Sequence, residues 1–245
     1  MRVVATIEAR MSSSRLPGKV LMPVLGRPLL SRLIERLKSV SIIEKIVLAT
    51  TINASDDILV KFAQDEEINI FRGSEFNVME RVIGAAQSVE ADVVVEITGD
   101  CPIIDPDIVS QTIQMFLSNP KADYVSNAHI RSYPDGMDVQ VFRLITLKNS
   151  AMLTSDPLDH EHVTLHIRNH PELYPALHLV APPSLFWPEL GLTLDEKSDY
   201  VLLDKIIRKL EPENPLFGCR DVIRLLIDNP EWVAINKGVV RKGDS

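Results

Sequence analysis

Apolar positions along the chain fall into two kinds of run, and the two kinds alternate. Short runs rich in β-branched residues predict buried strands. They lie at 3–7, 46–50, 69–71, 93–98, near 124, at 137–142 and at 177–180. Runs with apolar residues at helical spacing predict helices, and these lie at 28–40, 55–65, 78–90, from 106, around 158–168 and beyond 198. This alternation predicts an α/β fold with a mostly parallel sheet covered on both faces.

Two of the helix starts carry signals of their own. Pro28 suits the first turn of a helix, where its missing N–H is harmless. Asp105 is the expected N-cap of the helix that begins at Pro106. The run Asp105-Pro106-Asp107 also matches the DxD pattern of glycosyltransferases, but the cap explains it better.

Composition favours a single domain. The chain has 245 residues, 45% of them hydrophobic, which is enough for one sizeable core. No repeat or linker-like stretch divides it, so we expect one domain over 1–245. A net charge of −8 argues against general binding to nucleic acid or to a membrane surface, which needs a basic excess. A few local cations still suffice to bind a nucleotide.

The expected compartment is the cytoplasm. The first apolar run meets a charge too early for a signal peptide, and no run approaches the roughly 20 apolar residues of a membrane span. Cys101 and Cys219 lie far apart without CxxC spacing. They predict a reducing compartment and neither a disulfide framework nor a zinc cluster.

The loop after the first strand carries the first candidate chemistry. In an open α/β sheet the ligand lies outside the carboxyl ends of the strands. This loop holds the cations Arg10, Arg15 and Lys19 and the hydroxyls of Ser12 and Ser13. The cations could converge on phosphates, and the loop N–H groups could form an anion nest. The alternative is a solvated basic loop.

Two aspartates add a candidate metal site. The central strand 93–98 runs directly into Gly99-Asp100. A carboxylate at such a strand exit, next to a glycine that permits close approach, suits a magnesium–phosphate site. The alternative for Asp100 is a turn residue that caps the next segment. Asp195 precedes the helix beyond 198, so it is either that helix's N-cap or the second metal carboxylate.

A histidine-rich segment permits one further interpretation. The motif HExxH would require histidine at the position of Thr164, so a zinc protease is excluded. His162 and His166 are expected to share a helix face, where lining a pocket or packing is favoured over binding zinc.

Several blocks of the sequence resemble a known family. Residues 9–21, ARMSSSRLPGKVL, resemble the first loop of the sugar-acid cytidylyltransferases, which activate 3-deoxy-manno-octulosonate and N-acylneuraminate. The remaining blocks look more like one branch, the spore coat polysaccharide biosynthesis protein F family. They lie at 71–75 with 77–78 and Arg81, at 98–102, 133–142, 161–164 and 192–195. The match spans almost the whole chain in the right order.

The resemblance implies a Rossmann-like, three-layer nucleotide-diphospho-sugar transferase fold with a mostly parallel mixed sheet. It also implies a homodimer, with CTP as co-substrate, Mg²⁺ as cofactor, and a small acceptor and dimerisation lobe within 125–190. By position in the family's motifs, Arg10 and Lys19 are implied to bind the triphosphate, with Arg15 as a weaker candidate. Asp100 and Asp195 are implied to bind the metal. Arg72, Ser74 and Arg81 fall where the family approaches the nucleoside.

Two departures from the family pattern fall on the acceptor side. Gln140 replaces an expected glutamate, and Leu165-His166 replaces Pro-Tyr. Alternation along 137–142 puts Asp138 and Gln140 on one face. These two side chains are predicted to bind sugar hydroxyls, with His162 nearby and Arg131 as a partner for the acceptor's carboxylate. The alternative is that this face meets solvent or a turn.

The expected function is therefore transfer of CMP from CTP to a small acidic sugar of the nonulosonic or octulosonic type, with release of pyrophosphate, for cell-surface polysaccharide synthesis. Two alternatives remain open at this point. One is a glycosyltransferase of related fold that uses a nucleotide sugar, and the other is a nucleotide-binding subunit without turnover.

Overall fold

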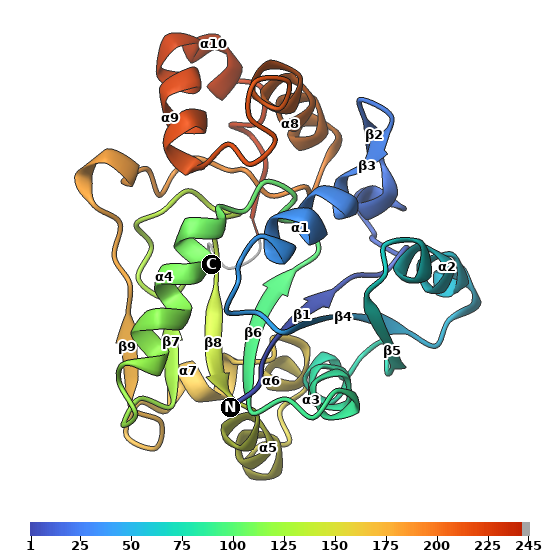
Figure 1. Cartoon of the computed structure of the whole chain (residues 1–245), viewed down its shortest axis with the longest axis vertical. Helices are drawn as coiled ribbons and strands as arrows, with labels where there is room; N and C mark the ends of the chain where they lie inside the picture. The colour runs from blue at the N-terminus through green and yellow to red at the C-terminus, as the bar shows by residue number, and fades with distance from the viewer. Residues whose placement is uncertain (242–245) are drawn as a thin grey trace.

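A computed structural model describes residues 1–241, and residues 242–245 of the predicted domain lie outside the described residues. Seven strands form one sheet, in which the first four of the spatial order are parallel and β8 runs antiparallel to both of its neighbours (Figure 1). The order across the sheet is β5 (Asn69–Gly73), β4 (Lys45–Thr51), β1 (Val3–Glu8), β6 (Val93–Thr98), β8 (Gln140–Arg143), β7 (Tyr124–Ser126) and β9 (Ala176–His178). A two-stranded ribbon, β2 (Pro23–Val24) and β3 (Arg27–Pro28), stands apart.

Helices cover both faces of the sheet, because successive side chains of each strand point to opposite sides. In β1, Ala5 and Ile7 belong to one core and Val4 to the other. The first core is completed by α1 (Leu29–Lys38), α2 (Asp57–Asp65), α4 (Pro106–Leu117), α8 (Lys197–Leu210) and α9 (Cys219–Asp228). The second is completed by α3 (Val78–Ser88), α5 (Leu144–Leu153) and α7 (Leu165–Asn169), with α6 (Pro157–Glu161) beside α3. The predicted three-layer α/β fold is confirmed.

Short elements complete the chain. They are the 3₁₀ turns η1 (Lys19–Leu21), η2 (Ala54–Asp56) and η3 (Pro183–Leu185) and the short helix α10 (Pro230–Val233). No helix within residues 1–241 is long and apolar enough to cross a membrane. The acceptor and dimerisation lobe at 125–190 stays a prediction, and β7, β8 and β9 join the main sheet.

The predicted N-cap at Asp105 is confirmed. Its Oδ1 accepts a hydrogen bond from the backbone N–H of Asp107 at 2.8 Å, and its Oδ2 accepts one from the N–H of Cys219 at 2.7 Å. One carboxylate thus caps α4 and ties the start of α9 to it. This double role explains the Asp-Pro-Asp run without a glycosyltransferase motif.

The single helix predicted around 158–168 is wrong. The structure has two short helices, α6 and α7, and Val163 between them has φ 46°. A β-branched residue in the left-handed region interrupts the helical path. His162 follows α6 whereas His166 lies within α7, so the shared helix face expected for these two histidines is also wrong.

The strand predicted at 137–142 is paired only from Gln140 onward. Before that point the side chain of Asn127, and not a neighbouring strand, bonds to the backbone. It donates to the carbonyl of Met137 and accepts from the N–H of Val139, both at 2.7 Å. The predicted alternation still holds, because Val139 packs in one core and Phe142 in the other.

Candidate active site at the carboxyl edge of the sheet

The loops after β1 and β6 lie against each other at the carboxyl edge of the sheet. The N–H of Gly99 donates to the carbonyl of Glu8 at 2.9 Å. A Cβ at position 99 would lie 2.8 Å from that same carbonyl oxygen, closer than side-chain carbons come to backbone. Glycine is therefore required for the approach, as the sequence predicted, and it brings Asp100 beside the first loop.

Lys19 joins the two candidate metal carboxylates. Its Nζ donates to Asp100 Oδ2 at 2.9 Å and to Asp195 Oδ1 at 3.0 Å, and the lysine side chain is only 12% exposed. Burial lowers the pKa of Lys19, but the two carboxylates outweigh burial and raise it above its ordinary value. Burial raises the pKa of Asp100, but Lys19 and the hydrogen bonds to this carboxylate together lower it below its ordinary value, so both partners are held charged.

The alternative of Asp195 as a helix N-cap is wrong. Glu196 is the N-cap of α8, and the carboxylate of Asp199 accepts the backbone N–H groups of Asp195 at 3.0 Å and of Glu196 at 2.8 Å. The side chain of Asp195 therefore faces the site, where Arg15 also pairs with it at 2.8 Å.

Two further side chains of the first loop are hydrogen-bonded to an acidic residue that was not among the predicted site residues. Glu75, just after β5, accepts from Arg10 at 3.0 Å, from Ser12 at 3.1 Å and from Asn53 at 2.7 Å. Ser13 accepts the N–H of Leu16 within the loop. The structure thus brings Arg15 and Lys19 onto the aspartates and turns Arg10 and Ser12 toward Glu75.

A second unpredicted carboxylate fixes the loop backbone. Asp56 is fully buried and accepts the N–H of Met11 at 2.8 Å and the hydroxyl of Thr51 at 2.5 Å. Burial raises the pKa of Asp56, but the hydrogen bonds from Thr51 and Met11 lower it below its usual value. No local pattern in the sequence marks this residue, because its partners lie on two other segments.

The three residues predicted near the nucleoside meet the loops after β4 and β5. Arg72 donates to the carbonyls of Thr51 and Asn53, both at 2.8 Å. Arg81, which is 3% exposed, donates to the carbonyl of Ser74. Ser74, Arg81, Asn53 and the adjoining Glu75 line a cavity of about 570 Å³, and Arg72 is outside its lining.

The predicted acceptor residues form two separate groups. Arg131 pairs with Asp138 at 3.1 Å and with Asp135 at 3.3 Å. Burial raises the pKa of Asp138 to about 7, against the opposing effect of Arg131. His162 is exposed at the end of α6.

Gln140 belongs to a different group, inside the sheet. Its Nε2 donates to the carboxyl of Glu96, and its Oε1 accepts from Tyr124 at 2.5 Å and from Thr164 at 2.6 Å. This carboxamide therefore has one N–H left for any ligand. Its first role in the structure is to hold Glu96.

Glu96 lies beside another buried acid, Glu8, on the same face of the sheet. Burial raises the pKa of Glu96 to about 7, and burial together with the charge of Glu96 raises the pKa of Glu8 well above its usual range. The charge of Arg168 opposes the shift at Glu96, and that of Arg81 opposes it at Glu8. The sequence did offer a signal for Glu96, because it is the one acidic residue in the otherwise apolar run 93–97.

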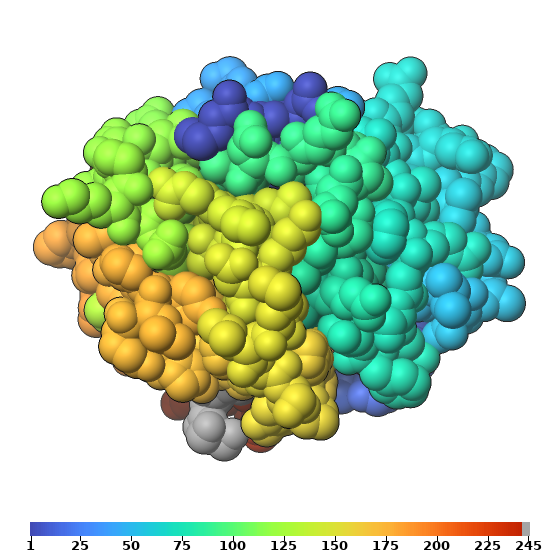
Figure 2. Space-filling model, turned by 90° about the horizontal axis from the view of Figure 1, so that it is seen from below, coloured from blue at the N-terminus to red at the C-terminus, as the bar shows by residue number. Residues whose placement is uncertain are grey.

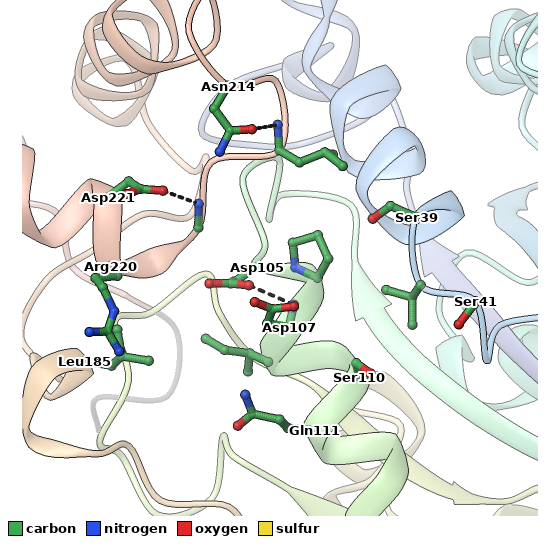
Figure 3. A pocket seen from close by; sticks show the side chains of 15 residues that line it. Ser39, Ser41, Asp105, Asp107, Ser110, Gln111, Leu185, Asn214, Arg220 and Asp221 are labelled. Atoms are coloured by element: carbon green, nitrogen blue, oxygen red, sulfur yellow. Dashed lines mark hydrogen bonds between the residues drawn. The ribbon is translucent and has the colours of Figure 1, made fainter.

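A further cavity, of about 600 Å³, opens between the N-termini of α4 and α9 (Figure 3). Asp105, Asp107 and Gln111 face it from α4, and Arg220 and Asp221 from α9. None of the predicted site residues lines it. The candidate active site is therefore the carboxyl edge of the sheet.

Fold and site together define a class of enzyme, the nucleotidyltransferases of the nucleotide-diphospho-sugar transferase fold. The cytidylyltransferase family model matches residues 4–207, and the chain belongs to this family. It is a cytidylyltransferase.

Three similar proteins support the assignment. The chain is 34% identical over 234 residues to the spore coat polysaccharide biosynthesis protein SpsF of Bacillus subtilis (strain 168), covering 94% of this chain and 95% of that protein. It is 29% identical over 154 residues to the 3-deoxy-manno-octulosonate cytidylyltransferase of Trichlorobacter lovleyi, covering 62% of this chain and 60% of that protein. A cytidylyltransferase structure from Leptospira borgpetersenii serovar Hardjo-bovis superposes with a TM-score of 0.91 at 29% identity, covering 98% of this chain and all of that one.

The buried acid at position 96 predicts a pH dependence of stability. Its pKa is raised from 4.5 to about 7, so the folded state binds the proton more tightly than the unfolded state does. Its contribution to stability is present below pH 4.5 and is lost as the pH rises toward 7. Glu96→Gln removes the charge and should raise the free energy of unfolding at pH 8 by on the order of 1–3 kcal/mol.

Urea unfolding at pH 4.5, 6 and 8 measures this difference. The gain should shrink toward zero at pH 4.5, and Glu213→Gln, at an exposed position, should show no such trend. A Glu96→Gln gain that is the same at every pH would contradict the assignment of the titration to this carboxyl.

Proposed function

We propose that this enzyme transfers CMP from CTP to a small acidic sugar of the nonulosonic or octulosonic type and releases pyrophosphate, with Mg²⁺ as cofactor. The reaction would take place in the cytoplasm and supply an activated sugar for cell-surface polysaccharide synthesis. The observation that carries the proposal is the single ammonium of Lys19 between Asp100 and Asp195. The octulosonate cytidylyltransferase and the spore coat protein among its relatives support the acceptor class and the pathway.

The donor set fits a magnesium ion. One ammonium reaches both Asp100 and Asp195, so their carboxylates lie close enough to share a cation. Among residues 1–241 no group of three or more histidine, cysteine and acidic side chains could hold a metal. Mg²⁺ commonly binds through one or two carboxylates, with phosphate oxygens and water as the other ligands. When bound, Mg²⁺ would neutralise charge on the phosphates and lower the pKa of the attacking hydroxyl.

The reaction follows from positioning and charge. The acceptor hydroxyl attacks the α-phosphorus of CTP and loses its proton to solvent. A new oxygen–phosphorus bond forms, and the bond to the β-phosphate oxygen breaks, so pyrophosphate leaves. Arg10, Arg15 and Lys19 hold the triphosphate and stabilise charge on the leaving pyrophosphate. Asp56 and Glu75 keep the loop that carries these cations in place.

On the acceptor side, Arg131 is proposed to pair with the carboxylate of the sugar acid and Asp138 to accept from its hydroxyls. The two side chains lie 3.1 Å apart, so both reach one ligand. Gln140 would use its remaining N–H toward the acceptor.

The enzyme is proposed to act as a homodimer. Helix α5 is apolar on both sides, since Leu147 is buried while Met152 and Leu153 are 77% and 64% exposed. Ile145 on α5 and Leu158 on α6 are also exposed apolar side chains, and the two helices lie in the yellow band across the face shown in Figure 2. Exposed apolar side chains of this kind suit a self-complementary interface between two copies.

The nucleotide specificity is testable by thermal shift. CTP with Mg²⁺ should stabilise the protein more than UTP, GTP or ATP, because a ligand that binds only the folded state stabilises it by about 2.7 kcal/mol at 100 times its Kd. Equal or greater stabilisation by UTP or GTP would overturn the choice of CTP. A screen of sugar acids with CTP, followed by pyrophosphate release, then identifies the acceptor.

The metal carboxylates are testable by conservative substitution. Asp100→Asn and Asp195→Asn should each lower turnover about 100-fold or more and raise the Mg²⁺ concentration needed. The double variant should lose little beyond either single one, because the pair acts as a unit. Asp65→Asn, at an exposed position of α2, is the control. Normal turnover of Asp195→Asn, with the fold intact by circular dichroism, would remove this residue from the site.

The interface is testable by charge. Met152→Glu should convert a dimer into a monomer in sedimentation or light-scattering measurements, because a carboxylate would be buried in an apolar contact. Val201→Glu, at an exposed apolar position of α8, should leave the dimer intact. If the unsubstituted chain sediments as a monomer, the interface is wrong.

A further inference from the structure

Residues 236–241 follow α10 and contact residues beside the candidate active site. Asn236 donates to the carboxylate of Asp199 at 2.8 Å. The carbonyl of Val240 accepts from Arg15 of the first loop at 2.8 Å. The segment therefore contacts both the loop that carries the triphosphate-binding cations and the start of α8.

Arg241 ends this segment and points into the protein. Its side chain is only 11% exposed. The guanidinium lies against Gly191, where an added Cβ would come within 1.7 Å of it, so any side chain at 191 would displace the guanidinium from this position. It donates to Thr193 and, at 3.1 Å, to Asp199, and it pairs with Asp135 at 3.5 Å.

Through Asp199, Arg241 is connected to the backbone of Asp195, one of the two proposed metal ligands. Asp199 is fully buried. Its Oδ1 accepts from Asn236 and Arg241, and its Oδ2 accepts the backbone N–H groups of Asp195 and Glu196. A fully buried carboxylate is stable only when it is paired and hydrogen-bonded. Arg241 supplies the charge that lets Asp199 fix the backbone of Asp195.

Through Asp135, Arg241 is connected to Arg131, the proposed partner of the acceptor's carboxylate. Asp135 pairs with Arg131 at 3.3 Å, and Arg131 pairs with Asp138 at 3.1 Å. Burial raises the pKa of Asp135, while Arg131 and Arg241 oppose the shift. One guanidinium thus supports two carboxylates, one behind the proposed metal site and one behind the proposed acceptor site.

We propose that Arg241 is a positioning residue of the transfer reaction, which acts through Asp199 on Asp195 and through Asp135 on Arg131. The inference rests on the proposed function. The family model ends at residue 207, so Arg241 lies outside the segment that defines the family. Polar partners behind metal ligands typically change metal affinity or activity about 10- to 100-fold when they are removed.

The test compares Arg241→Gln and Arg241→Lys with Arg208→Gln, which removes an exposed ion pair on α8. Arg241→Gln should lower kcat about 10- to 100-fold, raise the Mg²⁺ concentration needed and raise the KM for the acceptor. Arg241→Lys should restore part of each loss because it keeps the charge. Hydrogen exchange of the Asp195 and Glu196 amides should become faster in Arg241→Gln, less so in Arg241→Lys, and stay unchanged in Arg208→Gln.

A readout without acceptor separates this inference from the proposed function. CTP-dependent thermal stabilisation is titrated with Mg²⁺ in each variant. If the unsubstituted enzyme is not stabilised by CTP and Mg²⁺, the proposed function fails. If it is stabilised, and Arg241→Gln matches it in Mg²⁺ requirement, kcat and amide exchange, the role of Arg241 fails. Equal losses in Arg208→Gln would also overturn that role.

Discussion

The ammonium of Lys19 between Asp100 and Asp195 is the interaction on which the site depends. Its three members come from the loop after β1, the exit of β6 and the segment before α8, so one ion pair network fixes the relative position of distant parts of the chain. Each charge is largely removed from water, and each is tolerated because the others are present. The contact is possible only because Gly99 lets the first loop and the β6 exit approach each other.

Around the Lys19 ion pairs, one kind of interaction is found three times: a buried or half-buried carboxylate accepts hydrogen bonds from a loop of the site. Asp56 holds the backbone of the first loop, Glu75 holds Arg10 and Ser12, and Asp199 holds the backbone of Asp195. Part of the acidic excess of the chain therefore lies inside the protein, where these carboxylates accept hydrogen bonds from the loops. Rigid strands place the loops, and these acids restrict how far the loops can move.

Residues whose signal is local could be predicted from the sequence. The strands of the main sheet and most helices followed from apolar periodicity, but the ribbon of β2 and β3 and helix α5 did not. The Asp105 cap followed from its spacing to Pro106, and the approach at Gly99 from its place after a central strand. The break at Val163 could not be predicted, because helical spacing continues through it. Glu75, Asp56 and Arg241 were missed for a different reason. Each acts through side-chain contacts with segments far away in the sequence, and no periodicity or motif records such contacts.

The contact between Gln140 and Glu96 limits how this protein can evolve. Gln140 stands where the related branch is expected to carry glutamate, and here its amide donates to Glu96, which already lies beside Glu8. Glutamate at 140 would place a third carboxyl against two buried ones, with no N–H to offer. The residues that position 140 tolerates therefore depend on the residue at position 96, because the sheet brings the two side chains together.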